Sequence, residues 1–349
     1  MATCAPAQPG RQAETADRTQ APIRARFGLC FRIVIARPDQ KNSATDSDTN
    51  AARKVSVRAP AKINLFLHVG DKRGDGFHAL ESLIVFAETS DRLEFTPASD
   101  LALKITGPFG KALSRDKDNL VLKAARALKA KYPDESLGAH IALEKNLPLA
   151  AGIGGGSADA AATLRALNQL WRFDLSEGEL LDIAVEIGSD VPACLLSSPC
   201  WMEGRGERVT KLAAMPPFEL VLVNPGVAVP TAPVFNALNA RSGVGAIVPP
   251  PALGSVWDLV AYLADAGNDL EAPAGRFAPV IEDVLAALGH EPACVLAQMS
   301  GSGATCFGLF DGSVYAAGAA ERIALEHPHW WVRSTRIAAP DIGAPHCAA

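Results

Sequence analysis

The sequence has no excess of positive charge. Its 33 Lys and Arg residues are outnumbered by 38 Asp and Glu residues, so the formal net charge is -5. Proteins that hold nucleic acid through phosphate contacts carry a basic excess or a clustered basic face. We therefore expect no nucleic-acid partner. A phosphate-bearing ligand would have to be attracted locally, by a few well-placed amides and lysines.

Paired cysteines and long apolar runs are missing as well. The seven cysteines are scattered, odd in number and never in a C-x-x-C pair. This pattern argues against a disulfide framework and against structural zinc, and it favours a reducing compartment. The longest apolar runs fall far short of the roughly 20 residues that span a bilayer. We expect a cytoplasmic protein with no membrane partner.

The N-terminal segment lacks the features of a signal peptide and of a folded domain. It does not begin with a basic region followed by an apolar run, as a secretory signal would. Residues 39–52 are nearly free of large apolar side chains. Such a segment cannot bury enough surface to offset the entropy lost on ordering. We predict that residues 1–53 are a disordered extension or the product of an upstream start codon. A transit peptide is the weaker alternative, because the segment contains five acidic residues.

Regular patterning begins near residue 54. Residues 55–69 alternate in the manner of a β-strand, which places Lys62 and Asn64 on the same face. Residues 82–87 and 92–96 are predicted to form further strands, because they are short, rich in strand-forming side chains and bounded by polar residues. The alternation therefore predicts a sheet in the first part of the chain.

The chain is long enough for two domains, since a single core rarely grows beyond about 250–300 residues. Helices alternate with strands in both halves, and a Pro-Pro pair at 216–217 separates them. Mixed elements of this kind indicate an α+β protein with two packed layers. We predict a first domain over residues 54–214, a second over 215–338 and a loose tail over 339–349.

The most informative segment is LPLAAGIGGGSADAAAT, residues 147–163. Its four glycines let the backbone turn sharply and approach a ligand closely. Ser157 then opens a helix, whose first amides are unpaired and whose dipole favours an anion. We expect this loop to bind the phosphates of ATP through the following residues: Pro148, Leu149, Ala150, Ala151, Gly152, Ile153, Gly154, Gly155, Gly156, Ser157 and Ala158.

Two other nucleotide loops do not fit this segment. A Walker A loop needs a lysine after its glycines, and none follows here. The Rossmann fingerprint needs a third glycine where Ser157 stands, after a buried apolar strand, whereas Pro148 interrupts the preceding segment. A glycine-rich turn without a ligand is the remaining alternative. Ordering four glycines costs conformational entropy on folding, and a turn that binds no ligand would offer nothing to offset that cost.

The pattern P-x-x-A-G-[IL]-G-G-G-S-[AS]-D resembles the phosphate-binding loop of the GHMP kinases. Further segments, in the same order as in that superfamily, extend the resemblance from about residue 54 to residue 336. They also point to its diphosphocytidyl-methylerythritol kinases. These segments are APAKINLFL (59–67), RGDGFH (73–78), IGSDVP (187–192), NPGVAVPT (224–231) and SGSGATCFGL (300–309).

The resemblance implies both a fold and a reaction. The fold is a two-domain α+β GHMP kinase fold, with ATP and substrate in the cleft between the domains and a ferredoxin-like C-terminal domain. The reaction is transfer of the ATP γ-phosphoryl group to the C2 hydroxyl of a diphosphocytidyl-methylerythritol, in the non-mevalonate route to isoprenoids. The expected partner is therefore a small molecule with a cytidine diphosphate group, and the protein would be a monomer or a homodimer.

The resemblance also implies residue roles. Asp190 matches the catalytic aspartate, and Lys62 its partner lysine, while Asn64 falls in the same substrate-side signature. Phe77 stands where the family has a tyrosine, so a ring that can stack on cytosine is kept and a hydroxyl is lost. His78 matches the residue at the cytosine edge, and Phe235 is expected to supply the opposite stacking face.

Simpler roles remain open for the same residues. An aspartate that follows Gly-Ser is often only a helix cap, a strand lysine is often solvated, and a helical phenylalanine such as Phe235 is often a core residue. Another GHMP kinase, or a nucleotide-binding regulator without activity, would share the loop. No acidic cluster suggests metal ligands, so Mg²⁺ is expected only as the partner of ATP, held by phosphates and water.

Overall fold

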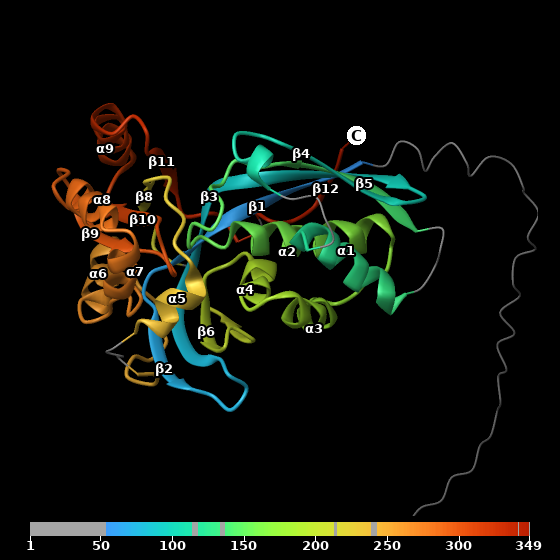
Figure 1. The fold of residues 1–349 in the computed structure, drawn as a ribbon, viewed down its shortest axis with the longest axis horizontal. Helices are drawn as coiled ribbons and strands as arrows, with labels where there is room; N and C mark the ends of the chain where they lie inside the picture. Colours follow the sequence, from blue (N-terminus) through green and yellow to red (C-terminus); the bar gives the residue numbers. More distant parts are fainter. Residues whose placement is uncertain are drawn as a thin grey trace, which may run out of the picture. The chain divides into compact units, whose positions relative to one another are not determined.

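Two sheets organise the chain, and helices cover one face of each sheet (Figure 1). The computed structural model describes residues 54–113, 118–132, 137–212, 215–238, 243–340 and 342–348. The predicted extension, residues 1–53, lies outside these described residues. The described residues belong to one compact unit, residues 45–349. The predicted domain boundary between residues 214 and 215 stays a prediction.

The first sheet contains eight strands in the described part of the chain. They are β1 (Lys54–Asn64), β2 (His68–Lys72), β3 (His78–Ala98), β4 (Leu101–Thr106), β5 (Gly138–Glu144), β6 (Cys200–Gly204), β7 (Arg208–Lys211) and β12 (His346–Ala348). The strand order is β12-β1-β3-β5-β4, while β2 and β6 pair with β3, and β7 pairs with β6. Only β4 and β5 run parallel among these pairs.

β3 is one strand of 21 residues, where the sequence pattern predicts two. The polar residues in its middle remain extended because β1 continues beside them: Ser90 and Asp91 lie opposite Pro60 and Ala59. The register shifts between Pro60 and Lys62, as expected where a proline cannot donate to the ladder. This irregularity falls directly before the lysine that the sequence analysis singles out.

Four α-helices and one short 3₁₀ helix accompany the first sheet. They are the 3₁₀ helix Gly110–Ala112, α1 (Leu120–Lys131), α2 (Gly155–Leu170), α3 (Glu177–Ile187) and α4 (Val191–Leu196). α2 is buried along most of its length, because its alanines let it pack closely on β1, α1 and α4. α3 begins with a capping box: the Ser176 side chain accepts from the Glu179 amide, and the Glu179 carboxylate accepts from the Ser176 amide at 2.8 Å.

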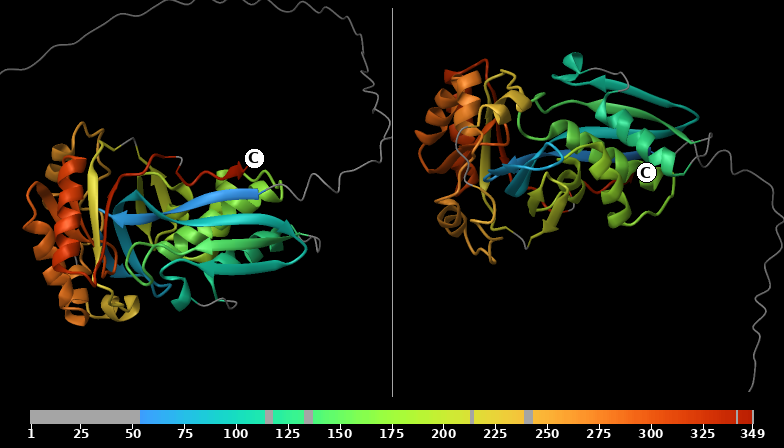
Figure 2. Two further views of the ribbon diagram at one scale, coloured as in Figure 1. Left: turned by 90° about the horizontal axis from the view of Figure 1, so that it is seen from above. Right: turned by 60° about the horizontal axis from the view of Figure 1, so that its bottom comes forward.

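The second sheet has four antiparallel strands among the described residues, in the order β11-β8-β10-β9. They are β8 (Glu219–Asn224), β9 (Cys294–Met299), β10 (Cys306–Phe310) and β11 (Trp331–Arg336). α8 (Val280–Gly289) leads into β9, α9 (Ser313–Glu326) connects β10 to β11, and both helices lie on one face (Figure 2). This β-α-β-β-α-β order is that of a ferredoxin-like fold, as predicted.

The two faces of the second sheet belong to different cores. In β8, Leu220 and Leu222 pack with residues of β1 and β3, whereas Val221 and Val223 belong to the core that includes α8 and α9. A strand buried on both faces is apolar at successive positions rather than alternating. The apolar sequence of β8 is therefore explained by the first sheet, which covers the face opposite the helices.

Three short helices lie around the second sheet: α5 (Thr231–Asn236), α6 (Val256–Leu263) and α7 (Glu271–Phe277). The start of α6 carries a local signal, since the Ser255 side chain accepts from the Asp258 amide. α7 contains Pro273 and Gly275, which obscure any helical pattern. No helix in the described part of the chain is long and apolar enough to cross a membrane.

The C-terminal tail is not loose throughout. β12 pairs with β1, and the Ser198 hydroxyl donates to the Pro340 carbonyl at 3.1 Å. Gly343 lies against the guanidinium of Arg165 on α2. The prediction of a loose tail is therefore wrong for residues 346–348. The tail pairs with the backbone of β1, which is almost 300 residues earlier in the chain. The composition of the tail itself therefore gives no sign of this pairing.

We expect Gly343→Ala to lower the melting temperature by a few degrees. A Cβ there would lie 2.5 Å from Nη2 of Arg165. Nη1 of Arg165 donates to the carbonyls of Cys194 and Leu195, so the guanidinium cannot move away freely. Overpacking of this kind costs about 1–3 kcal/mol. Calorimetry would measure the change against Gly289→Ala, whose Cβ meets nothing within 4 Å. Equal melting temperatures for the two variants would contradict this packing.

Candidate active site

The glycine loop between β5 and α2 packs tightly against a loop of the second sheet. Gly152 has a φ of 75°, and a Cβ there would lie 2.3 Å from the Ser300 carbonyl oxygen. A Cβ on Gly301 would lie 2.5 Å from the Gly152 oxygen in return. The Ser300 hydroxyl donates to the Gly152 carbonyl at 3.2 Å, and the Thr305 amide donates to the Ala151 carbonyl at 3.1 Å. The backbones approach so closely that glycine is required on both sides.

The same loop leaves the start of α2 open. Gly154 is the N-cap of α2, in the left-handed region with a φ of 62°. A Cβ on Gly154 would lie 3.2 Å from the Cβ of Lys62. The first amides of α2, beginning at Gly155, have no acceptor within the helix, and the helix dipole favours an anion there. The geometry therefore suits the phosphate site that the sequence predicts.

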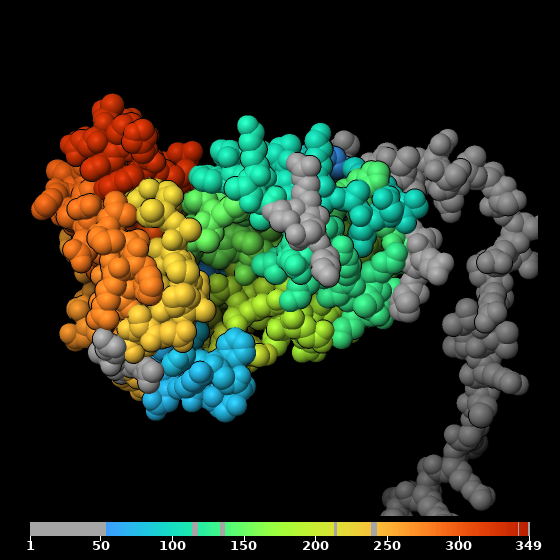
Figure 3. Space-filling model, in the orientation of Figure 1, coloured from blue at the N-terminus to red at the C-terminus, as the bar shows by residue number. Residues whose placement is uncertain are grey.

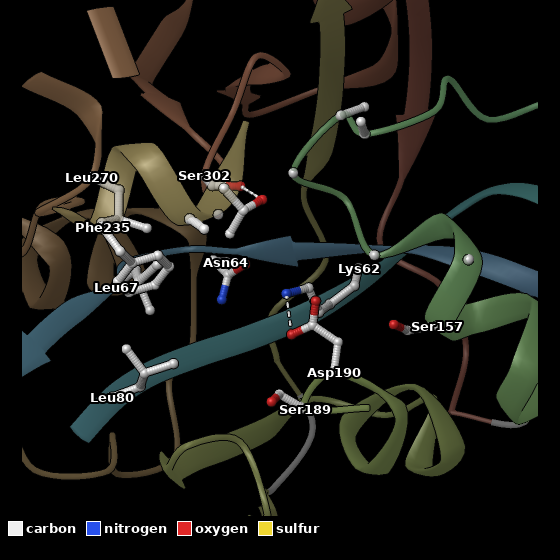
Figure 4. Close-up of a pocket in the computed structure, with 18 of the residues that line it drawn as sticks. Lys62, Asn64, Leu67, Leu80, Ser157, Ser189, Asp190, Phe235, Leu270 and Ser302 are labelled. Atoms are coloured by element: carbon white, nitrogen blue, oxygen red, sulfur yellow. Dashed lines mark hydrogen bonds and ion pairs between the residues drawn. The ribbon is translucent and has the colours of Figure 1, made fainter. Parts of the chain in front are cut away.

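Lys62 and Asp190 lie together beside this helix end. Nζ of Lys62 is 2.9 Å from Oδ1 of Asp190, and the Lys62 amide donates to the Ile153 carbonyl at 3.0 Å. The Lys62 side chain is 4% exposed and that of Asp190 is 36% exposed. Asp190 is the N-cap residue of α4, but its side chain makes no cap hydrogen bond. The carboxylate faces the lysine instead of capping the helix, and it remains accessible (Figure 4).

Asn64 lies near this pair and is 1% exposed. Its Nδ2 donates to the Ser82 hydroxyl at 2.8 Å, and its backbone amide donates to the Ser300 hydroxyl at 3.1 Å. Oδ1 has no hydrogen-bond partner among the described residues. A buried acceptor that borders a cavity is ready for a donor on a ligand.

Three rings predicted to bind cytosine lie farther along the cavity. The rings of His78 and Phe235 are stacked, with centroids 5.8 Å apart and an interplanar angle of 23°. Nδ1 of His78 is 3.0 Å from the Gly70 carbonyl oxygen. Phe77 is 49% exposed, and the Arg205 guanidinium lies 5.3 Å from its ring centroid. The structure thus pairs Phe235 with His78, and Phe77 with Arg205.

A cavity of about 850 Å³ brings these groups together. In Figure 3 it opens where yellow residues around α5 face green residues of the glycine loop. All the predicted site residues line the cavity except Ile153 and Ala158, which are 0% and 1% exposed and belong to the apolar cores. In Figure 4 the apolar side chains of Leu67, Leu80 and Phe235 lie at the end away from Ser157.

The cavity also contains polar residues that the sequence analysis did not select. Ser189, Thr231 and Ser302 fall within segments already quoted for the resemblance, which were the available signal. Lys72, Lys145 and Arg205 carry no such signal beyond their charge, although Arg205 stands between two glycines. The added polar residues are Lys72, Lys145, Ser189, Arg205, Thr231, Asn236 and Ser302.

Lys145 belongs to a buried group of three charged side chains beneath the glycine loop. Its Nζ contacts Oδ2 of Asp91 and lies 2.6 Å from Oδ2 of Asp159. The three side chains are 1%, 0% and 2% exposed, respectively. Oδ1 of Asp159 has no hydrogen-bond partner among the described residues. One ammonium therefore faces two buried carboxyl groups. Both oxygens of Asp91 have hydrogen-bond partners, whereas only one oxygen of Asp159 has one among the described residues.

Burial raises the pKa of Asp159 to about 8, although the charge of Lys145 acts in the opposite direction. Burial alone would lower the pKa of Lys145, but the carboxyl groups of Asp159 and Asp91 outweigh it and raise that pKa. The raised pKa of Asp159 favours its uncharged form at neutral pH, which lessens the charge imbalance of the group.

Two family models match the chain. The model described as GHMP kinases N terminal domain matches residues 119–198, and that described as GHMP kinases C terminal matches residues 254–328. The chain is 50% identical over 281 residues to a protein of Cereibacter sphaeroides named 4-diphosphocytidyl-2-C-methyl-D-erythritol kinase, with 80% of this chain and 98% of that protein covered. A protein of the same name from Parvibaculum lavamentivorans is 49% identical over 280 residues, which cover 80% of this chain and 96% of that protein.

Two solved structures of GHMP-type kinases also match the fold of this chain. A crystal structure of 4-(cytidine 5'-diphospho)-2C-methyl-D-erythritol kinase matches with a TM-score of 0.65 and 34% identity, over 81% of this chain and all of that chain. A homoserine kinase from Cytophaga hutchinsonii matches with a TM-score of 0.67 at 19% identity, over 88% of this chain and all of that chain. At that identity, the second match supports the fold alone.

The fold and the sequence relatives define the class of protein: the chain belongs to the GHMP kinases, and the predicted α+β GHMP kinase fold is confirmed. Its relatives at about 50% identity place it more narrowly. Within the superfamily, it belongs to the 4-diphosphocytidyl-2-C-methyl-D-erythritol kinase family.

The raised pKa of Asp159 predicts a pH-dependent stability. The folded-state pKa of about 8 exceeds the ordinary value of 3.8, so the folded state binds the proton more tightly than the unfolded state. The stability that this proton contributes is complete below about pH 4 and is lost as the pH rises through 8. Asp159→Asn cannot lose a proton. Its melting temperature is therefore expected to rise relative to wild type between pH 5 and pH 8.5.

Asp91→Asn is the matched control for this measurement. Oδ1 of Asp91 accepts from the amides of Asn146 and Leu147, and Oδ2 contacts the Lys145 ammonium. An amide in its place would direct an NH₂ group at one of these donors. Asp91→Asn should therefore melt below wild type even at pH 6. A constant difference between Asp159→Asn and wild type across the range would show that Asp159 holds no extra proton.

Proposed function

We propose that the chain transfers the γ-phosphoryl group of ATP to the C2 hydroxyl of 4-diphosphocytidyl-2-C-methyl-D-erythritol, giving the 2-phosphate and ADP. The observation that carries the proposal is the Lys62–Asp190 pair, which borders the same cavity as the start of α2. The choice of acceptor is supported by relatives of about 50% identity that bear the name of this enzyme.

Asp190 is proposed to accept the proton of the attacking hydroxyl. Phosphoryl transfer depends mainly on positioning and on stabilising charge. The Asp190 carboxylate is partly exposed to the cavity, and Lys62 holds one of its oxygens at 2.9 Å. The Lys62 ammonium is itself buried, so its interaction with charge that develops on the transferring group is weakly screened.

ATP is proposed to place its phosphates at the start of α2. Gly154, Gly155 and Gly156 border the cavity at this end of the helix, and the first turn of α2 contains no acidic residue. The described residues hold no group of three His, Cys, Asp or Glu side chains suited to a metal. Mg²⁺ would therefore be held by phosphate oxygens and water, where it neutralises the charge of the phosphates.

The cytidine diphosphate group of the acceptor is proposed to lie along β2, the start of β3 and α5. Phe77 and Phe235 supply ring faces for a base, and His78 is placed to contact its edge. Asn64 offers a buried acceptor oxygen nearer the reacting pair. Lys72 and Arg205 border the same part of the cavity and provide positive charge for the diphosphate.

The wider setting follows from this reaction. We propose that the enzyme acts in the cytoplasm, in non-mevalonate isoprenoid precursor synthesis, as a monomer or a homodimer. We also propose an ATP-binding domain over residues 54–214 and a second domain over residues 215–338. The separate ferredoxin-like sheet, which begins with β8 at residue 219, supports that boundary.

The reaction can be tested with the purified full chain, Mg-ATP and the cytidylyl alcohol. ADP is expected to form only when the alcohol is present. Asp190→Asn is expected to lower kcat by about 10²–10⁴-fold, the usual effect of losing a general base. The Kd for Mg-ATP should barely change, since the carboxylate acts on the acceptor hydroxyl. A coupled assay of ADP release and calorimetric titration measure the two quantities.

Three other outcomes would each contradict a different part of the proposed function. Near-normal turnover in Asp190→Asn would reject the base assignment and leave the kinase intact. ADP formation with homoserine or mevalonate, and none with the cytidylyl alcohol, would overturn the proposed acceptor. ATP binding without turnover on any alcohol would favour a non-catalytic regulator.

Phe235→Ala is expected to raise the KM for the cytidylyl alcohol by about 5- to 100-fold, because loss of one stacking face weakens base binding by about 1–3 kcal/mol. The KM for ATP should stay within about twofold, since Phe235 lies at the other end of the cavity. Phe277→Ala is the matched control, as this exposed ring does not line the cavity. An equal rise in both Michaelis constants would count against a role in base stacking.

A further inference from the structure

The buried group formed by Lys145, Asp91 and Asp159 is not accounted for by the proposed reaction. It does not include the reacting pair, Lys62 and Asp190. Its three side chains are almost completely buried, with exposures of 2% or less. Burying ions costs several kcal/mol for each ion, and apolar residues of similar size would often be more stable. Its geometry therefore needs an explanation other than stability.

One part of the group holds the start of the glycine loop. Asp91 lies in the middle of β3, opposite Ala59 of β1, so its backbone is fixed by the sheet. Its Oδ1 accepts from the amide of Asn146 at 2.6 Å and from that of Leu147 at 2.8 Å. These are the first two residues after Lys145. The carboxylate thereby fixes the point where the chain leaves β5 for the loop.

The other part holds the end of the loop. Asp159 lies on α2 one helical turn after Gly155, and its Oδ2 lies 2.6 Å from Nζ of Lys145. That ammonium also lies directly under the first turn, since a Cβ on Gly155 would be only 3.1 Å from Nζ. The start of α2 is thereby tied to the side chain at the start of the loop.

We propose that Lys145, Asp91 and Asp159 act as a loop clamp, which sets the position of the phosphates of ATP by holding both ends of residues 146–154. The clamp rests on the proposed function, because it acts on ATP only through that loop. The three residues are positioning residues. The sheet fixes Asp91, Asp91 fixes Lys145 and the start of the loop, and Lys145 fixes Asp159 and α2.

The protonated state of Asp159 agrees with this role. A clamp that carried two carboxylates and one ammonium would place an uncompensated negative charge beneath a phosphate site. With its pKa raised to about 8 by burial, the Asp159 carboxyl keeps its proton at neutral pH. An uncharged Asp159 lowers the negative charge of the clamp, so the clamp repels the anion above it less.

The clamp should affect nucleotide binding and leave acceptor binding nearly unchanged. The rings proposed to bind the acceptor, Phe77, His78 and Phe235, lie around β2, the start of β3 and α5, and none of the clamp's hydrogen bonds reaches them. A general loss of stability would weaken the binding of both ligands. A selective loss of nucleotide binding would not follow from lower stability.

The test is Asp159→Ala in the full chain, with Mg-ADP and CDP as probes in calorimetric titrations, together with steady-state kinetics. This variant leaves Lys145 paired with Asp91, so no buried charge loses its partner and the chain should fold. The Kd for Mg-ADP and the KM for ATP are expected to rise about tenfold or more, because small displacements of a positioning loop are costly. The Kd for CDP should stay within about twofold.

Asp159→Asn restores an oxygen to accept from Lys145, and it is expected to return the Kd for Mg-ADP to within about twofold of wild type. Ile323→Ala, a buried site on α9 far from the loop in sequence, controls for lost stability. It should lower the melting temperature without changing the Kd for Mg-ADP.

The outcomes separate the clamp from the proposed function. If wild type and Asp159→Ala bind Mg-ADP with the same Kd, the clamp is overturned and the proposed function still stands. Equal weakening of Mg-ADP and CDP, or no recovery in Asp159→Asn, would also overturn it. A wild-type protein that binds no Mg-ADP would overturn the proposed function and the clamp together.

Discussion

The candidate site depends on how closely β1 approaches the start of α2. The Lys62 amide donates to the Ile153 carbonyl at 3.0 Å, and the lysine side chain lies against Gly154, where any Cβ would be 3.2 Å from that of Lys62. This approach brings a buried ammonium beside the open end of a helix. A larger residue at 154 would require a strained backbone and would push the two elements apart. One phosphoryl group could then no longer lie within reach of both the helix amides and the Lys62–Asp190 pair.

The second sheet contributes to the same cavity through the backbone. The loop at residues 300–303 packs on the glycine loop so closely that Gly152 and Gly301 both need to be glycine. Nδ2 of Asn268 donates to the carbonyls of Met299 and Gly301, at 2.9 Å and 2.7 Å, and so supports that loop from the far side. Residues of both loops therefore line the same cavity.

Local charge explains how a chain with a net charge of -5 can bind two anionic ligands. Lys62, Lys72, Lys145 and Arg205 all border the cavity, whereas Asp190 is the only acidic residue that does so among those described. The Lys145 ammonium contacts Asp91 and Asp159 from below, and burial raises the pKa of Asp159. The excess of acidic residues thus lies elsewhere on the protein and does not set the field inside the cavity.

The sequence by itself determined the superfamily, the glycine loop and the strand that carries Lys62, because these depend on local backbone freedom and on residue order. Helix ends with side-chain caps, such as Ser176, were also predictable. The sequence did not show that β3 is continuous, that β12 pairs with β1, or that Lys145 reaches Asp91 and Asp159. Lys145 and Asp159 are 14 positions apart, and the strands β1 and β12 are nearly 300 positions apart. A buried lysine has the same local pattern as a solvated one, so only the tertiary structure decided its partners.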